Sequence, residues 1–208
     1  MEPIHIELKN LGKRFNRQWI FRKLDYSFSS GNAYAITGFN GSGKSTLLQI
    51  IAGAMEKSEG ELAYKNERGA IPQEVFYRQF AMSAPYLELI EELTFGEFYR
   101  FHFGLKPILP GHSIGSVIEK IGLADAANKE IRQFSSGMKQ RAKLGQAFFS
   151  NVPVLLLDEP TANLDTQGIE LYHQLITEYT KNRLVIICSN DEQEIRFCNH
   201  RLDVTNFK

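Results

Sequence analysis

The feature that most constrains the fold is a glycine-rich loop at 38–46 with the sequence Gly-Phe-Asn-Gly-Ser-Gly-Lys-Ser-Thr. An apolar run, Ala33–Ile36, precedes this loop, and a second run, Leu47–Ile51, follows it as the start of a helix. A G-x-x-x-x-G-K-[ST] pattern between a strand and a helix is typical of a phosphate-binding P-loop. The spacing therefore predicts an α/β fold in which a strand delivers this loop to a helix N-terminus.

The residue types in the loop suit the triphosphate of a nucleotide. Backbone N–H groups converge on phosphate oxygens only where glycines let the chain wrap closely around them. Lys44 can reach the β- and γ-phosphates, and the Ser45 hydroxyl can bind Mg²⁺. The alternative is a glycine-rich turn that happens to fit the pattern. The predicted nucleotide-binding residues of the loop are Gly38, Asn40, Gly41, Ser42, Gly43, Lys44, Ser45 and Thr46.

Composition adds limits on partners and compartment. The 208 residues are enough for one sizeable core, and 24 basic residues balance 24 acidic ones, so no net charge favours nucleic acid or an anionic membrane. No apolar run approaches the ~20 residues of a membrane span, and the N-terminus lacks the charged and apolar regions of a signal peptide. Two cysteines, Cys188 and Cys198, are too few for a disulfide framework, so a reduced cytosolic setting is expected.

Two strands are expected before the P-loop strand. Apolar and polar residues alternate at 4–8 and at 24–28, which predicts a small antiparallel layer, and a turn cluster at 29–32 follows. Phe15 and Trp19 lie between these strands. Either aromatic could stack on an adenine ring or could be an ordinary core or edge residue, and the sequence leaves both interpretations open.

The middle of the chain, 80–149, is expected to form a helical subdomain inserted between two parts of the core, 1–79 and 150–208. Within it, 94–97 has the T-x-x-E spacing of a capping box, which predicts a helix, and 113–121 predicts another that stops at Gly122. Phe98, Phe101 and His102 are expected on one face of the first helix. His102 and His112 have no ligand partners at metal-binding spacing and are interpreted as structural or surface residues.

A second candidate site lies after the apolar run Val154–Leu157. The residues that follow this run are Asp158, Glu159 and Pro160. An uninterrupted apolar run is typical of a strand buried in a parallel sheet, and ligands bind at the carboxyl ends of such strands. Asp158 could therefore hold Mg²⁺, while Glu159 could orient or deprotonate an attacking water. The alternative is a pair of solvated acids at a strand end.

The third motif is Ser135-Ser136-Gly137-Met138, which precedes a helix. Hydroxyl groups and free amides at a helix start form an anion-binding corner. The local chemistry alone favours a plain serine-capped helix.

These stretches, in this order, resemble the ATP-binding subunits of ABC transporters across essentially the whole chain. Gly38–Thr46 resembles the Walker A motif, and Val154–Glu159 resembles Walker B with its catalytic glutamate. Ser135–Met138 is similar to the ABC signature, usually Ser-Gly-Gly-Gln, and Asn163–Asp165 is similar to the D-loop. Phe15 lies where the family places its adenine-stacking aromatic.

The resemblance implies a P-loop NTPase, or RecA-like, core with an antiparallel β layer and a helical insert. It implies that ATP and Mg²⁺ bind, that two subunits pair head to tail, and that a separate membrane-spanning subunit is driven from the cytoplasmic side, without nucleic acid. A homodimer is expected. Each ATP would lie between one P-loop and the partner's signature residues, here Ser135, Ser136 and Gly137.

Two positions depart from the family pattern. Asn190 occupies the place of the switch histidine, so it can donate a hydrogen bond to a γ-phosphate but carries no positive charge. The place of the Q-loop glutamine falls at about Pro85, with Glu88 nearby. We therefore predict nucleotide binding with slow hydrolysis, in which Glu159 and Asn190 are the catalytic candidates.

Three other functions remain as alternatives. An ATP-binding regulatory module with little turnover is favoured by Asn190 and the missing glutamine. A soluble P-loop enzyme such as a nucleoside kinase would lack the signature and the Asp-Glu pair. Non-transport ABC proteins that act on ribosomes or DNA usually have tandem domains or long inserts, which 208 residues do not accommodate.

Overall fold

The computed structural model describes residues 1–208 as two compact units. The first unit contains 1–80, 153–158 and 182–208, and the second contains 81–152 and 159–181. The predicted helical subdomain, 80–149, lies almost wholly in the second unit. That unit also includes α6 (Thr166–Tyr179), because α6 packs against α5 (Ser136–Phe149).

The first unit holds an antiparallel sheet in the order β2-β1-β4-β5. In its register Ile6 lies opposite Phe28 on one side and Tyr64 on the other, and all three side chains are buried. Cross-strand pairs of this kind stabilise a sheet with one covered face. The strands are β1 (His5–Phe15), β2 (Gln18–Ser29), β4 (Glu59–Asn66) and β5 (Gly69–Ile71).

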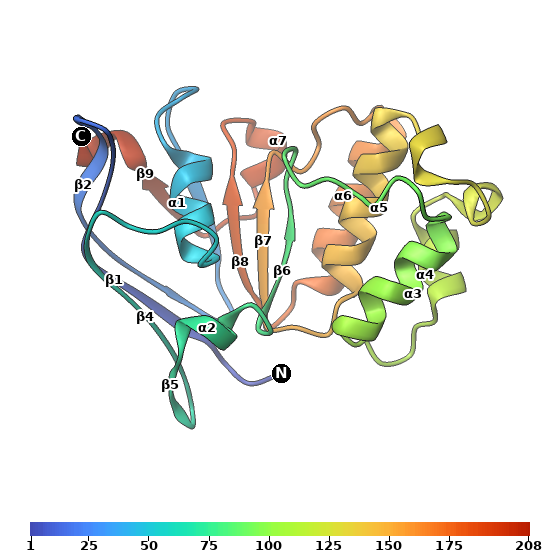
Figure 1. Ribbon diagram of the computed structural model, residues 1–208, viewed down its shortest axis with the longest axis horizontal. Helices are drawn as coiled ribbons and strands as arrows, with labels where there is room; N and C mark the ends of the chain where they lie inside the picture. The colour runs from blue at the N-terminus through green and yellow to red at the C-terminus, as the bar shows by residue number, and fades with distance from the viewer. The chain divides into compact units, whose positions relative to one another are not determined.

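The first unit also contains a parallel sheet in the order β7-β8-β3-β9. Every residue of β7 and β8 is buried, as their unbroken apolar sequences predict. Helix α1 (Lys44–Ile51) packs on β7 and β8, as the ribbon in Figure 1 shows. The strands are β7 (Val154–Asp158), β8 (Leu184–Cys188), β3 (Ala33–Thr37) and β9 (His200–Asp203); α2 (Gln73–Phe76), α7 (Glu192–Ile195) and a 3-10 turn, Val204–Phe207, complete the unit.

The second unit is helical, and its helices α3, α4 and α5 contact one another (Figure 1). The predicted capping box is present: the Thr94 side chain accepts from the amide of Glu97, whose carboxylate accepts from the amide of Thr94. Gly122 follows the second helix with φ 71°, the left-handed conformation expected of a helix stop. The helices are α3 (Phe95–Leu105), α4 (Ile114–Lys120), α5 and α6, with 3-10 turns at Ala124–Ala126 and Ile131–Gln133; β6 (Phe80–Ser83) lies at the unit boundary.

The expectation for the face of α3 is wrong at one residue. Phe98 is buried, but Phe101 is 54% exposed, because the buried stripe instead includes Phe95 and Tyr99. His102 has the structural role that was predicted. Its Nε2 lies 2.9 Å from the Ser150 hydroxyl, and burial lowers its pKa to about 4.

Candidate functional site

The P-loop connects β3 to α1, as predicted. Gly43 is the residue before the helix and has φ 109°, a conformation that non-glycine residues rarely adopt. A Cβ atom at Gly43 would lie 2.4 Å from the Ile20 side chain of β2. Glycine is therefore required at this position both by the backbone and by the close approach of the β1–β2 hairpin.

Lys44 begins α1 and is 6% exposed. Its ammonium donates a hydrogen bond of 2.8 Å to the carbonyl of Gly38, so the side chain bends back over the loop. Gly38 has φ 139°, and a Cβ there would meet the Ser42 hydroxyl at 2.6 Å. The loop thus holds a cation beside glycine backbone, which fits an anionic ligand.

The register of the parallel sheet brings the P-loop strand and Asp158 to one edge. Ile36 of β3 and Asp158 of β7 both lie opposite Cys188 of β8. Asp158 is 2% exposed at the carboxyl end of its strand, and the Cys188 thiol donates to the carbonyl of Lys44 at 3.4 Å. The strand ends therefore place Asp158 two strands away from the P-loop strand.

The residues at this edge fit a divalent ion. A buried carboxylate such as Asp158 is stabilised by a nearby cation, and Ser45 supplies a half-buried hydroxyl on the first turn of α1. The chain contains no cluster of three or more histidine, cysteine, aspartate or glutamate residues suited to a metal. Mg²⁺ at this edge would take most of its ligands from phosphates and water, as it commonly does.

Asn190 follows β8 at the same edge of the sheet. Its Nδ2 donates to the carbonyl of Gly38 at 2.8 Å, and its Oδ1 accepts from the amide of Gly38 at 3.2 Å. The side chain predicted to face a γ-phosphate therefore pairs with the backbone at the start of the P-loop.

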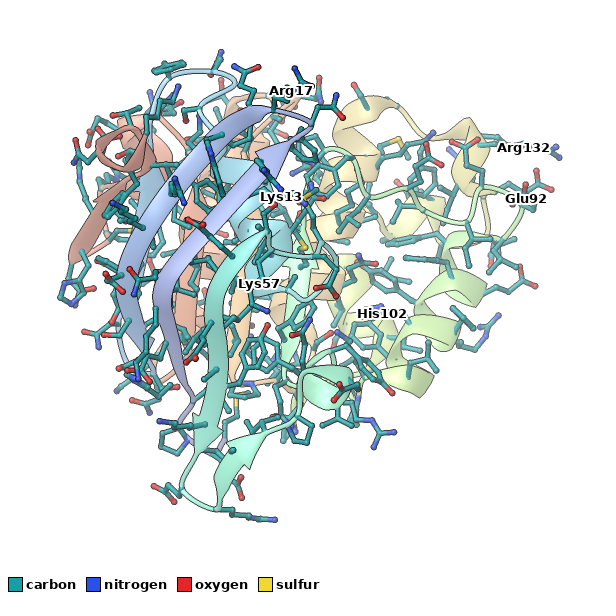
Figure 2. The ribbon with its side chains drawn as sticks, turned by 60° about the vertical axis from the view of Figure 1, so that its left-hand side comes forward. Lys13, Arg17, Lys57, Glu92, His102 and Arg132 are labelled. Atoms are coloured by element: carbon teal, nitrogen blue, oxygen red, sulfur yellow. The ribbon has the colours of Figure 1, made fainter.

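The tip of the β1–β2 hairpin carries both candidate aromatics. Phe15 is 47% exposed, with the Lys13 ammonium 4.8 Å from its ring centre. Trp19 is contacted by the guanidinium groups of Arg14 and Arg22, at 5.6 Å and 4.4 Å. Figure 2 shows Lys13 and Arg17 at this end of the hairpin. Phe15 thus presents the more accessible ring of the two.

The signature residues lie in the second unit at the start of α5. The Ser135 hydroxyl accepts from the amide of Met138 at 3.2 Å, so this serine caps the helix. Gly137 is tightly placed, because a Cβ there would lie 3.1 Å from the carbonyl of Asn163. The signature and the D-loop are therefore packed against each other.

Asp165 of the D-loop begins α6 and connects to the signature helix. Its carboxylate accepts from the amide of Gly168 at 2.8 Å and pairs with Arg141 at 2.8 Å. These two contacts, the Gly168 bond first, lower the pKa of Asp165. An open cavity of about 480 Å³ adjoins this cluster. It is lined by Gly122, Leu123, Asp125, Ala126, Lys129, Ser135, Ser136, Gly137, Met138, Arg141, Asn163 and Asp165.

Glu159 follows β7 directly and is exposed, with φ 42°. A positive φ at a residue other than glycine is the left-handed backbone conformation. Such a conformation is costly for a residue other than glycine and is often found at functional sites.

Lys143 is a buried cation that the sequence analysis missed. It is 8% exposed on α5, and its ammonium donates to the carbonyls of Ala84 and Pro85 at 3.2 Å and 3.1 Å. Burial is the main cause that lowers its pKa. The contact joins α5 to the turn at Ala84 and Pro85. The only sequence signal for a buried lysine here is its position between the apolar residues Ala142 and Leu144.

The P-loop, the signature residues and Asp158 all fall within a stretch that matches a known protein family. The family described as "ABC transporter" matches residues 21–162. The chain belongs to this family. ABC transporter proteins of this type bind ATP and are ATPases, and the predicted P-loop NTPase fold is confirmed by solved ABC ATPase structures.

Individual relatives agree over nearly the whole chain. An uncharacterized ABC transporter ATP-binding protein, YybJ of Bacillus subtilis, is 28% identical and covers 97% of this chain and 93% of its own length. The cytochrome c biogenesis ATP-binding export protein CcmA of Xanthomonas campestris is 30% identical over 87% of this chain and 86% of its own. A putative ABC transporter ATP-binding protein from Pyrococcus furiosus has the same fold, with a TM-score of 0.81, 19% identity and coverage of 98% and 99%.

This ABC ATP-binding protein has no helix that combines the length and apolar character of a membrane span.

Proposed function

We propose that this chain is the ATP-hydrolysing subunit of an ABC transporter. It works as a head-to-tail homodimer on MgATP and drives a separate membrane-spanning chain from the cytoplasmic face. The main support is the parallel-sheet edge at which the P-loop, Asp158 and Asn190 meet. The second unit adds the signature cavity, which in the family faces the partner's nucleotide.

Each site residue has a role in this proposal. The loop amides and Lys44 bind the phosphates, and Phe15 stacks on the adenine. Ser45 and Asp158 hold Mg²⁺, which when bound neutralises charge on the β- and γ-phosphates. Glu159 orients the attacking water and accepts its proton. Ser135, Ser136 and Gly137 complete the partner's site.

Turnover is expected to be slow. Asn190 supplies no positive charge, and a hydrogen bond to a charged group is worth about 1.5–3 kcal/mol, so hydrolysis should fall roughly ten- to a hundredfold below that of a histidine-containing site.

The test is phosphate release combined with nucleotide binding by calorimetry. Wild-type protein should bind MgATP and hydrolyse it slowly, Glu159→Gln should bind but not hydrolyse, and Lys44→Ala should lose binding. Hydrolysis that is unchanged in Glu159→Gln would refute the role of this carboxylate. Absence of ATP uptake by the wild type would refute the whole proposal.

A second candidate is a regulatory module that closes on ATP with almost no turnover. The pairing of Asn190 with Gly38 favours this second candidate. The side chain at the position expected for the switch histidine is a neutral amide, and it is bonded to the P-loop backbone. ATPase activity measured with and without a membrane-spanning partner separates the two, since only a transport ATPase is expected to be stimulated.

A further inference from the structure

The amide of Asn190 uses both of its polar ends on a single residue. Nδ2 donates to the carbonyl of Gly38 and Oδ1 accepts from its amide, at 2.8 Å and 3.2 Å. A carboxamide carries a donor and an acceptor side by side without a charge, so it can pair with a peptide group in this way. An imidazole cannot make this two-bond contact.

The carbonyl of Gly38 has a second donor, the ammonium of Lys44, at 2.8 Å. A carbonyl oxygen has two lone pairs and accommodates both. The Lys44 ammonium has three N–H donors, so it can bind phosphate while it keeps this bond, or turn fully toward the phosphate. In either case Asn190 remains as a hydrogen-bond donor to Gly38, so the carbonyl is not left unsatisfied.

The backbone around Asn190 is held in place for this contact. The amide of Ser189 donates to the carbonyl of Ile36 at 3.2 Å, and the Ser189 hydroxyl accepts from the amide of Asp191 at 2.9 Å. The Asp191 carboxylate in turn accepts from the amide of Gln193. Bonds on both sides therefore orient Asn190 toward the P-loop before any ligand arrives.

We propose that Asn190 is a positioning residue that holds the first glycine of the P-loop by two hydrogen bonds and so fixes the loop backbone for phosphate, whether or not Lys44 keeps its bond to the Gly38 carbonyl. This inference rests on the proposed nucleotide site. It assigns Asn190 to the loop that holds every phosphate rather than to the γ-phosphate alone. Asn190 should therefore support the binding of nucleoside di- and triphosphates equally. Its side chain is a neutral amide and carries no titratable charge.

The first experiment compares MgADP with a non-hydrolysable MgATP analogue by calorimetry. Asn190→Ala should weaken both ligands about tenfold, as the loss of two neutral hydrogen bonds suggests, with the ratio of their Kd values unchanged within about twofold. Selective loss of the triphosphate would overturn the proposal in favour of γ-phosphate contact, and unchanged binding of both would also overturn it. Gln193→Ala, an exposed amide nearby, should bind as wild type does.

The second experiment uses the protein without nucleotide. Hydrogen exchange at the Gly38 amide should be about tenfold faster in Asn190→Ala than in the wild type, since local protection depends on the bond to Oδ1. Asn190→Asp keeps that acceptor but loses the donor, so it should retain the protection while losing affinity for MgADP. Exchange at Gly38 that is the same in wild type and Asn190→Ala would overturn the proposal. Failure of the wild type itself to bind nucleotide would instead refute the proposed function.

Discussion

The glycines of the P-loop share one motif but are required for different reasons, one for its backbone conformation alone and another also for lack of space. Gly41 and Gly43 both have positive φ, at 79° and 109°. No atom lies within 4 Å of a Cβ built at Gly41, whereas Ile20 lies 2.4 Å from one built at Gly43. The motif pattern does not distinguish a glycine that is required only for its positive φ from one at which a side chain would also clash with a neighbour.

This pair gives a matched test. Gly41→Ala should cost about 1 kcal/mol of stability from backbone strain, while Gly43→Ala should cost about 3 kcal/mol or more and weaken ATP binding over tenfold. Urea unfolding and calorimetry measure the two effects. Equal losses of unfolding free energy in the two variants would show that the Ile20 side chain of the hairpin makes no steric contact with position 43.

The lowered pKa of His102 should make the stability of the fold depend on pH. Its folded pKa is about 4, below the unfolded value of about 6.5, so the unfolded state binds more protons between these values. Its contribution is therefore present at pH 7 and is lost as the pH falls through 6.5 toward 4, by about 2 kcal/mol between pH 7 and pH 5. Urea unfolding at the two pH values should show a smaller pH dependence in His102→Gln. An identical dependence would contradict the shifted pKa.

At the scale of elements, α5 combines a structural cap with a predicted ligand contact. Ser135 caps the helix through the amide of Met138, whereas no hydrogen bond of the Ser136 side chain is present. The plain serine-capped helix that the sequence left open is thus a correct description of Ser135.

The two serines can be separated by substitution. Without nucleotide, Ser135→Ala should lower the free energy of unfolding by about 1 kcal/mol and Ser136→Ala by less than about 0.5 kcal/mol. Chemical denaturation measures both variants. A larger loss in Ser136→Ala would show that the cap has been assigned to the wrong serine.

For the whole molecule, the proposed head-to-tail dimer has two equivalent sites, each made from two chains. Lys44→Ala removes the P-loop cation, and Gly137→Asp places a carboxylate in the tight space beside Asn163. Each variant alone should be nearly inactive. An equal mixture should recover about a quarter of wild-type ATPase, because half of the dimers are mixed and each mixed dimer has one intact site.

The mixing experiment has a clear negative outcome. If sites were formed within one chain, the mixture would be as inactive as either variant alone. Re-equilibration of subunits can be checked with a tag on one variant.

The sequence predicted the elements around the site better than the contacts between distant residues. The buried strands, the P-loop and the capping box at Thr94 follow from local patterns, and the structure confirms them. The pairing of Asn190 with Gly38 joins residues 152 positions apart, so no local pattern contains it. Lys143 was missed for the same reason, and Phe101 was misplaced because periodicity does not fix which of two adjacent stripes is buried.

The bonds of Lys143 to Ala84 and Pro85 join α5 to the turn that follows β6. A glutamine introduced at position 85 would meet an ammonium group already bonded to the local backbone, and would also relax a chain that proline holds at fixed φ. Replacement of Pro85 by glutamine should therefore leave the Lys143 contact in place, because both of its acceptors are backbone carbonyls.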